Sequence, residues 1–231
     1  MSKLILANKG ISMLPITVSA DADEVIVNAA KELAHYLKRI TGATFEVKKG
    51  DIAPAINLSC DETLDEEEFV LKSDEKIFSI TAGTARGIFY GVYGFLEDVL
   101  GAAFYTADVT KLPIIERLEL NDLYFTDKPR LEYRQIDYPP CMYSEWRIKN
   151  RINGKDNDNT RTMDQFGGIK DYALFVHTFN HLVDPQIYFD EHPEYFSLVN
   201  GVRLKDRAQL CLTNPEVINI ATESVRRELR N

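Results

Sequence analysis

The chain has 231 residues, 45% of them hydrophobic and 27% charged, which is typical of a globular protein with one or two domains. Its 36 acidic and 27 basic residues give a net charge of −9, which repels nucleic acid and anionic membrane surfaces and excludes both as expected partners. The three cysteines show no CxxC spacing, and their odd number favours buried thiols in a reducing compartment over a disulfide framework.

The first residues, MSKLILANKGISMLP, contain an apolar run that is too short for the core of a signal peptide. As written, the sequence therefore predicts a cytoplasmic protein. The alternative is a secreted or periplasmic protein whose leader has been removed.

The first clear element is an amphipathic helix that Asp21 or Asp23 can cap and that Gly42 ends. Its apolar positions share one face: Ile26, Ala29, Ala30, Leu33, Leu37 and Ile40. Strands are expected to follow at residues 45–48, 56–59, 69–72 and 77–81. Residues 1–125 are thus predicted to form one α/β domain.

A second helix is predicted from the spacing of its glycines. Gly83, Gly87 and Gly91 recur every four residues and Gly94 follows three later, so one side of the helix is nearly smooth. Glycine costs about 1 kcal/mol relative to alanine inside a helix, and close packing on the sheet is expected to offset that loss. A membrane-spanning helix is excluded because Arg86 and the acidic residues after Gly94 interrupt the ~20 apolar residues it needs.

Three segments of this half carry a resemblance to a known family: KELAHYLKRITGA (31–43), GTARGIFYGVYGFLEDVLGAAFY (83–105) and KPRLEYR (128–134). Together they resemble the non-catalytic N-terminal domain of α-glucuronidases and related family-20-type glycoside hydrolases. Residues 177–215 are similar to a large group of uncharacterised bacterial proteins that carry this domain before a barrel. The resemblance implies a small α/β sandwich domain of the hydrolase accessory type, followed by a (β/α)₈ barrel.

The domain boundary is expected at residues 125–126, within the polar and aperiodic sequence LNDLYFTDKP. Beyond it we predict strands at 131–136 and 173–176, a short helix after Asp184, a hairpin that turns at Asn200-Gly201, a strand at 210–212, and a helix capped by Asn214. A complete barrel needs about 250 residues. Residues 126–231 are therefore predicted to hold only its first two or three units, so that the barrel is incomplete.

Catalytic residues are not assigned. Glycoside hydrolysis generally needs two carboxyl groups on either side of the scissile bond, and no such pair is recognisable in this sequence. The resemblance implies that the acid and the base come from later barrel strands. The polypeptide by itself is therefore predicted to be inactive.

Two groups of residues are candidates for sugar binding. The segment MYSEWRIKNRING holds Trp146, Arg151 and Asn153, where an aromatic face can stack on a sugar ring and a guanidinium can grip a carboxylate. The second group follows the predicted strand 173–176 and lies at the end of the strand where barrel active sites form: His177, Phe179, Asn180 and His181. The structural alternatives are a surface helix whose tryptophan covers the barrel bottom, a buried hydrogen-bonded His177 and a core Phe179.

No metal and no cofactor are predicted. His177 and His181 lack a clear third ligand and a helix that would align their rings for zinc. The glycines from Gly83 onward do not form a GxGxxG dinucleotide motif. The expected partner is a carbohydrate, including an oligosaccharide with uronic acid, and the unfinished sheet edge would favour self-association.

The leading functional hypothesis is a fragment of a carbohydrate-active protein, similar to α-glucuronidases, that acts on glycosidic bonds of poly- or oligosaccharides when complete. The first alternative is a non-catalytic carbohydrate-binding or scaffolding module. A truncated product without independent function is the second. Because one fold hosts many chemistries, the resemblance is more specific for architecture than for reaction.

Overall fold

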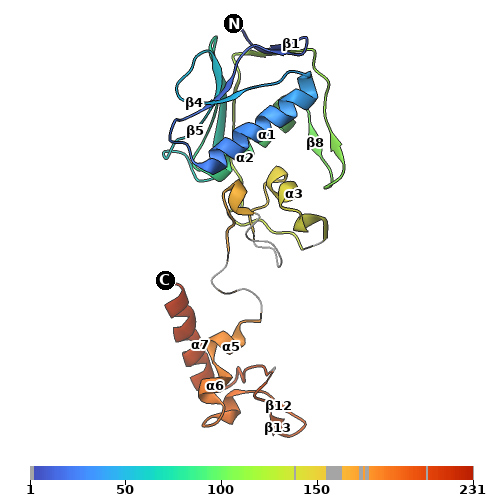
Figure 1. Cartoon of the computed structure of the whole chain (residues 1–231). Coiled ribbons are helices and arrows are strands. Elements are labelled where there is room, and N and C mark those ends of the chain that lie inside the picture. The colour runs from blue at the N-terminus through green and yellow to red at the C-terminus, as the bar shows by residue number, and fades with distance from the viewer. Residues whose placement is uncertain are drawn as a thin grey trace. The chain divides into compact units, whose positions relative to one another are not determined.

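The computed structural model describes residues 3–137, 139–154, 163–171, 174, 177–206 and 208–230 (Figure 1). The chain divides into two compact units, unit 1 over residues 1–170 and unit 2 over residues 171–231. Residues 126–170 pack with unit 1, so this unit extends beyond the boundary expected at 125–126. That boundary, as a limit between family domains, stays a prediction.

Unit 1 is built on a mixed six-stranded sheet with the strand order β11-β6-β7-β5-β3-β4. Its strands are β3 (Ile16–Val18), β4 (Val47–Lys49), β5 (Ala55–Cys60), β6 (Phe69–Ser73), β7 (Ile77–Ala82) and β11 (Tyr124–Asp127). β4, β3, β5 and β7 pair in parallel, whereas β6 pairs antiparallel with both β7 and β11. The strands predicted at 56–59, 69–72 and 77–81 are confirmed, and the one predicted at 45–48 begins two residues later.

The sheet buries one face. Along β7 the side chains of Phe78, Ile80 and Ala82 are buried, while Ser79 and Thr81 between them are half-buried. This alternation has the two-residue period of a strand, so a slip of one residue would turn the apolar set away from the core.

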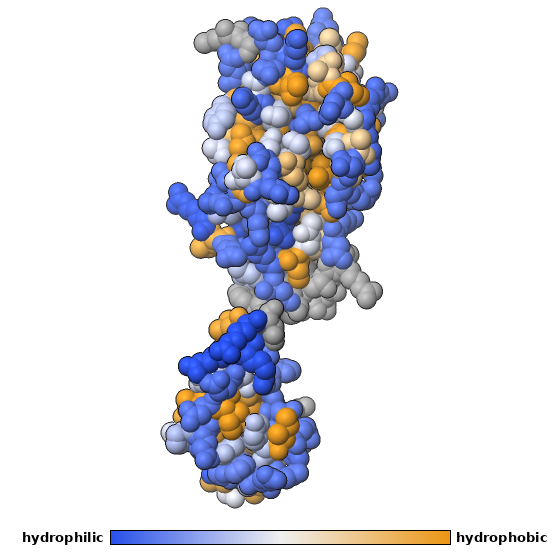
Figure 2. Space-filling view, turned by 90° about the vertical axis from the view of Figure 1, so that its left-hand side faces the viewer, coloured by the Kyte–Doolittle hydropathy of each residue, from blue (hydrophilic) through white to orange (hydrophobic). Residues whose placement is uncertain are grey.

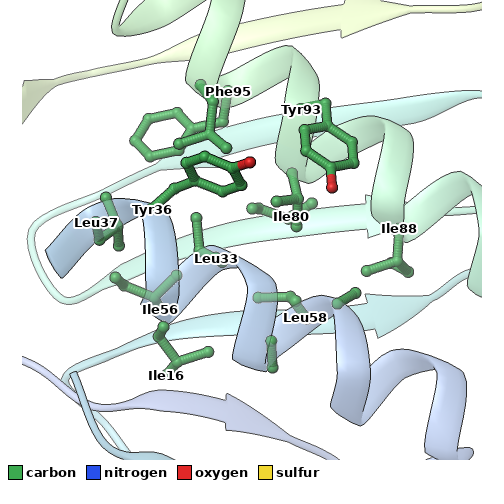
Figure 3. Packing of buried hydrophobic residues seen from close by; sticks show 14 of the residues in the cluster. Ile16, Leu33, Tyr36, Leu37, Ile56, Leu58, Ile80, Ile88, Tyr93 and Phe95 are labelled. Carbon is green, nitrogen blue, oxygen red and sulfur yellow. The ribbon is translucent and has the colours of Figure 1, made fainter. Parts of the chain in front are cut away.

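Two helices cover the buried face side by side (Figure 1). Helix α1 (Glu24–Thr41) is capped by the Asp23 carboxylate, which accepts from Val25 N at 2.7 Å, and it ends at Gly42 with φ 76°. Helix α2 (Ala85–Gly94) continues into the π-helical turn η1 (Phe95–Val99). Both predicted helices and the caps of α1 are confirmed, and Figure 3 shows their buried side chains packed between the helices and the strands.

The smooth side of α2 lies against the sheet, as its glycines predict. Within α2, a methyl group would approach a neighbouring atom within 2.8 Å or less at Gly87, Gly91 and Gly94. Gly83 lies before the helix, against the backbone of Asp65, so the prediction that it is helical is wrong. At Gly87 the nearest atom is the Glu66 carbonyl oxygen at 2.8 Å, and at Gly91 it is Ile80 Cγ2 at 2.6 Å. The close contact that offsets the helix penalty of glycine is therefore confirmed.

The remaining elements of unit 1 surround this core. A second sheet has the order β10-β1-β2, with β1 (Lys3–Asn8), β2 (Ile11–Ser12) and β10 (Arg117–Asn121), and β8 (Ala103–Phe104) forms a hairpin with β9 (Thr110–Lys111). The chain then forms η2 (Pro139–Met142), α3 (Ser144–Lys149) and η3 (Asp164–Phe166).

The strand predicted at 131–136 is wrong. These residues form an irregular segment, because the Arg134 backbone bonds outside any sheet: its N–H donates to Asn153 Oδ1 at 2.9 Å and its carbonyl accepts from Gly154 N at 2.8 Å. An apolar-polar alternation over a few residues does not distinguish such a segment from a strand.

Unit 2 has a small core of its own, made by Val183, Tyr195, Phe196, Ala208, Leu210 and Val217. Its elements are α5 (Phe179–Leu182), α6 (Pro185–Tyr188), η4 (Pro193–Tyr195), β12 (Leu198–Val199), β13 (Val202–Arg203) and α7 (Pro215–Glu228). The predicted caps Asp184 and Asn214 are confirmed, and so is the hairpin, because Asn200 (φ 50°) and Gly201 (φ 79°) both have the positive φ that a type I′ turn requires. On one face of each unit, hydrophobic residues are interspersed with polar ones (Figure 2).

Two further strand predictions have different outcomes. The strand predicted at 210–212 is wrong. Leu210 forms only a single bridge to Phe196, because the segment before Phe196 is the turn η4 and not a strand. Most of the strand at 173–176 lies outside the described residues. Within the described part after residue 127, parallel pairing is limited to the bridge between Gly154 and Lys170, and the incomplete barrel stays a prediction.

The cysteines differ from expectation. Cys60, the last residue of β5, is exposed and Cys211 is half-buried, so the prediction of buried thiols is wrong for both. The side chain of Cys141 lies outside the described residues. No helix in the described part of the chain combines the length and the apolar character needed to cross a membrane.

Candidate functional site

Helix α3 positions the tryptophan that the sequence singles out. Glu145 lies in its first turn and Lys149 in its last, an arrangement that complements the helix dipole. Trp146 is only 7% exposed and packs against Ile152. Its indole Nε1 is buried without a hydrogen-bond partner among the described residues.

A cavity of about 440 Å³ opens beside this helix, and we call it the α3 cleft. Its lining comes from the β8–β9 loop, η2, α3 and η3: Thr106, Ala107, Asp108, Met142, Tyr143, Ser144, Glu145, Trp146, Lys149 and Gln165. Tyr143 is 61% exposed and offers an accessible aromatic ring. The cleft thus combines aromatic surface with hydroxyl, amide and charged groups, which is the composition that sugar rings require.

A second cavity of about 500 Å³ adjoins the first, and we call it the α1 cavity. Its lining comes from α1, α2, α3 and η3: Asn28, Lys31, Glu32, His35, Tyr36, Arg39, Phe89, Glu145, Lys149, Gln165 and Phe166. Glu145, Lys149 and Gln165 line both cavities. Both volumes lie within the range of roughly 300–1,000 Å³ that is usual for small-molecule sites.

Cations gather around one aromatic ring in the α1 cavity. Lys149 Nζ lies 5.6 Å from the centroid of Tyr36 and 5.7 Å from that of Phe104, and Arg39 Cζ lies 5.5 Å from the centroid of Tyr36. Glu32, on the same helix, accepts a hydrogen bond from Tyr93 Oη at 2.6 Å. Burial, and then the Glu32 carboxylate, raise the pKa of Tyr93 well above its ordinary value.

The other two candidates of the tryptophan segment are held inside unit 1. Arg151 Nη2 lies 3.5 Å from Glu97 Oε2 and 3.3 Å from Asp98 Oδ2, both on the π-helical turn η1. Burial raises the pKa of Glu97, and the Arg151 charge opposes that shift. Asn153 is fully buried and bonds Arg134 N and Glu67. Neither side chain lines the two cavities, and a role of either in sugar binding stays a prediction.

A buried polar cluster holds this segment on the domain, and sequence reasoning missed it. Glu67 accepts from Arg86 Nε at 2.9 Å, from Arg134 Nη2 at 2.6 Å and from Asn153 Nδ2 at 2.8 Å. The carboxylate therefore joins three separate segments of unit 1 and has a structural role. The sequence carries no signal for it, because Glu67 stands in an acidic run that is typical of a solvated loop.

The second predicted group lies at the start of α5 in unit 2. His177, Phe179, Asn180 and His181 are all exposed, Phe179 by 37%, and His177 has a positive φ of 61°. These four residues are near neighbours in the sequence, and the structure exposes the side chains of all of them. The alternatives of a buried His177 and a core Phe179 are therefore wrong. In the described ranges, no three His, Cys, Asp or Glu side chains are grouped so as to hold a metal ion.

Two family models match this chain. Residues 104–231 match the model described as domain of unknown function DUF4838, and residues 12–102 match glycosyl hydrolase family 20, domain 2. No curated protein matches.

Several solved structures are similar at low identity. A family GH115 4-O-methyl-α-glucuronidase with specificity for decorated arabinogalactans is 12% identical with a TM-score of 0.55, over 97% of this chain and 40% of that one. A chitobiase of Flavobacterium johnsoniae is 14% identical with a TM-score of 0.45, over 96% and 40%, and a β-N-acetylhexosaminidase of Streptomyces coelicolor is 22% identical with a TM-score of 0.42, over 58% and 25%. The chain spans less than half of each of these proteins, and the first similarity shows a shared fold.

Proposed function

The chain belongs to the DUF4838 family, which its residues 104–231 match, and from this premise we propose that it is the sugar-binding part of a carbohydrate-active protein. The match of residues 12–102 to a domain of family 20 glycosyl hydrolases supports this role. In the complete protein, the activity we propose is cleavage of glycosidic bonds in poly- or oligosaccharides, of the α-glucuronidase type.

The α3 cleft is the place where we propose that sugar binds. The observation that carries this proposal is the lining of the cleft, which combines the exposed ring of Tyr143 and the largely buried Trp146 with groups that can donate to and accept from sugar hydroxyls. An aromatic face packs on the C–H surface of a pyranose, while polar neighbours fix its orientation. We propose the exposed residues His177, Phe179, Asn180 and His181 of unit 2 as a separate group of sugar contacts.

Calorimetric titration with neutral oligosaccharides tests the cleft. Tyr143→Ala should weaken binding by about tenfold, since an aromatic contact contributes up to roughly 1.5 kcal/mol beyond its buried area. Tyr124→Ala is the matched control, because Tyr124 is 68% exposed on the edge strand β11 and lines neither cavity. Equal affinities of the two variants would refute the proposed site.

The alternative of a non-catalytic binding or scaffolding module has one observation in its favour. Glu67, the carboxylate that unit 1 buries most completely among its described residues, accepts hydrogen bonds from two arginines and an amide, which gives it a structural role. We propose that this polypeptide alone does not hydrolyse aryl glycosides or glucuronides. Turnover by the purified chain that is lost in His177→Ala would contradict this.

A further inference from the structure

We propose that the α1 cavity binds the acidic group of a sugar, a ring that bears a carboxylate or a sulfate ester. This inference rests on the proposed function and names the class of sugar and the residues that select it. Its evidence differs from that for the α3 cleft, because it comes from the charges on α1 and α3.

One face of α1 lines the cavity. Asn28, Lys31, His35 and Arg39 follow one another at intervals of three and four residues, so their side chains lie along one side of the helix. Lys149 reaches the same space from α3. The site is therefore built from two helices that lie far apart in the sequence.

Arg39 and Lys149 both lie beside the Tyr36 ring without a neutralising carboxylate among the described residues. Both cations lie within 6 Å of the Tyr36 ring, and no ion pair joins either of them to an acidic side chain among the described residues. By contrast, Lys31 on the same face pairs with Glu24 at 3.2 Å. A ring face attracts cations but does not cancel their charge.

This arrangement is notable in a chain with 36 acidic and only 27 basic residues. Both cations attract an anion that enters the cavity, and such an anion offsets the repulsion between them. Arg39 supplies a planar fork that suits the two oxygens of a carboxylate or sulfate, and Lys149 supplies a point charge. His35, whose ring lies edge-on to Tyr36 at 5.2 Å between centroids, adds a further nitrogen to the lining.

Two acidic side chains, Glu32 and Glu145, also line the cavity. Glu32 is engaged by the hydroxyl of Tyr93, and Figure 3 shows Tyr36 and Tyr93 near each other at the α1–α2 contact. Glu145 is exposed and lines both cavities, so its charge opposes an anion and lowers the affinity for an acidic sugar.

Glu145, Lys149 and Gln165 line both cavities. In this proposal one oligosaccharide places a neutral ring beside Tyr143 and an acidic ring beside Arg39. The acidic group adds affinity to a ligand that the α3 cleft already holds, and it gives the protein a preference for charged over neutral sugars.

The test compares three disaccharides by calorimetry at low salt: a neutral glucose disaccharide, its counterpart with glucuronic acid, and its 6-O-sulfate. At least one acidic sugar should bind about tenfold more tightly than the neutral one, and the preference should fall as salt screens the charges. Comparison of the glucuronic acid disaccharide with the 6-O-sulfate shows whether the site binds a carboxylate or a sulfate ester.

Substitutions test which residues cause the preference for acidic over neutral disaccharides. Arg39→Gln and Lys149→Gln should each abolish most of it, and Arg39→Gln should leave affinity for the neutral disaccharide unchanged, because Arg39 does not line the α3 cleft. Lys38→Gln is the matched control: it removes the same charge from the same turn of α1, yet Lys38 lies outside the cavity. Glu145→Gln should raise the ratio of acidic to neutral affinity.

Each outcome decides the inference. Binding of the neutral disaccharide without preference for either acidic one overturns it and leaves the proposed function standing. A preference that survives in both Arg39→Gln and Lys149→Gln overturns it as well, because the anion then binds elsewhere. Failure of all three sugars to bind the folded wild-type chain removes the proposed function together with the inference.

Discussion

Arg86 and Glu67 form a buried ion pair in unit 1, with Arg86 Nε donating to Glu67 Oε1 at 2.9 Å. Their side chains are only 9% and 7% exposed, and the two residues come from α2 and from the loop before β6. The same carboxylate binds Arg134 and Asn153, so one side chain attaches the irregular segment after β11 to the core domain. This attachment holds the segment that contains Arg134 and Asn153 within unit 1.

Removal of the Glu67 charge should destabilise unit 1 strongly. Glu67→Gln leaves two arginines facing each other without their shared carboxylate, and loss of one partner of a buried pair costs about 3–5 kcal/mol. The free energy of unfolding can be followed in urea by the fluorescence of Trp146, the only tryptophan of the chain. The control Glu62→Gln, at an exposed position, should stay within about 0.5 kcal/mol of wild type. A loss no larger than that of the control would refute the structural role of the cluster.

Alanine at Gly91 should lower stability although alanine favours helices. The added methyl group would lie 2.6 Å from Ile80 Cγ2 and 3.3 Å from Phe69 Cβ. Overpacking of this kind costs about 1–3 kcal/mol, which exceeds the gain of roughly 1 kcal/mol in helix propensity. The sign of the change in urea unfolding is the readout: a more stable Gly91→Ala protein would mean that α2 does not lie this close to the sheet.

Unit 1 should lose stability in alkali through Tyr90. Burial, with the Glu67 carboxylate adding to it, raises the pKa of Tyr90 from 10.0 to about 12. Between these values the native protein keeps a proton that the unfolded chain releases, so the free energy of unfolding falls with rising pH by up to about 1.4 kcal/mol per pH unit. Below pH 10 this contribution is fully present.

The measurement is urea unfolding at several pH values above 9, for wild type and for Tyr90→Phe. The substitution removes the titrating group, so the decline with pH should become shallower, whatever the constant offset from the lost hydrogen bond with Arg134. Parallel declines in the two proteins would show that Tyr90 does not titrate in this range.

Local signals in the sequence predicted the elements of unit 1 well. The cap Asp23, the apolar face of α1 and the stop at Gly42 act within a few turns of one helix, so they can be read without knowledge of the fold. The same holds for the turn at Asn200-Gly201 in unit 2. The strand predicted at 131–136 was wrong because the Arg134 backbone bonds the side chain of Asn153 and the N–H of Gly154, which no local pattern indicates.

The candidate site was predicted only in part. Trp146 stands out as the only tryptophan, and it lies in a cavity. Arg39, Tyr36 and Lys149 were not singled out as a set, because α1 and α3 come together only in the folded chain. In the helix pattern Arg39 looks like an ordinary solvated charge near a C-terminus.

By itself, the sequence determined which segments of this protein become helices and strands and which helix face is apolar or smooth, because period, caps and turn residues act over short distances along the chain. Only the tertiary structure decided which charges are neutralised. Glu67 meets two arginines in the interior, whereas Arg39 and Lys149 meet an aromatic ring. The physical reason is that electrostatic partners are selected by distance in space, and packing of the core sets that distance.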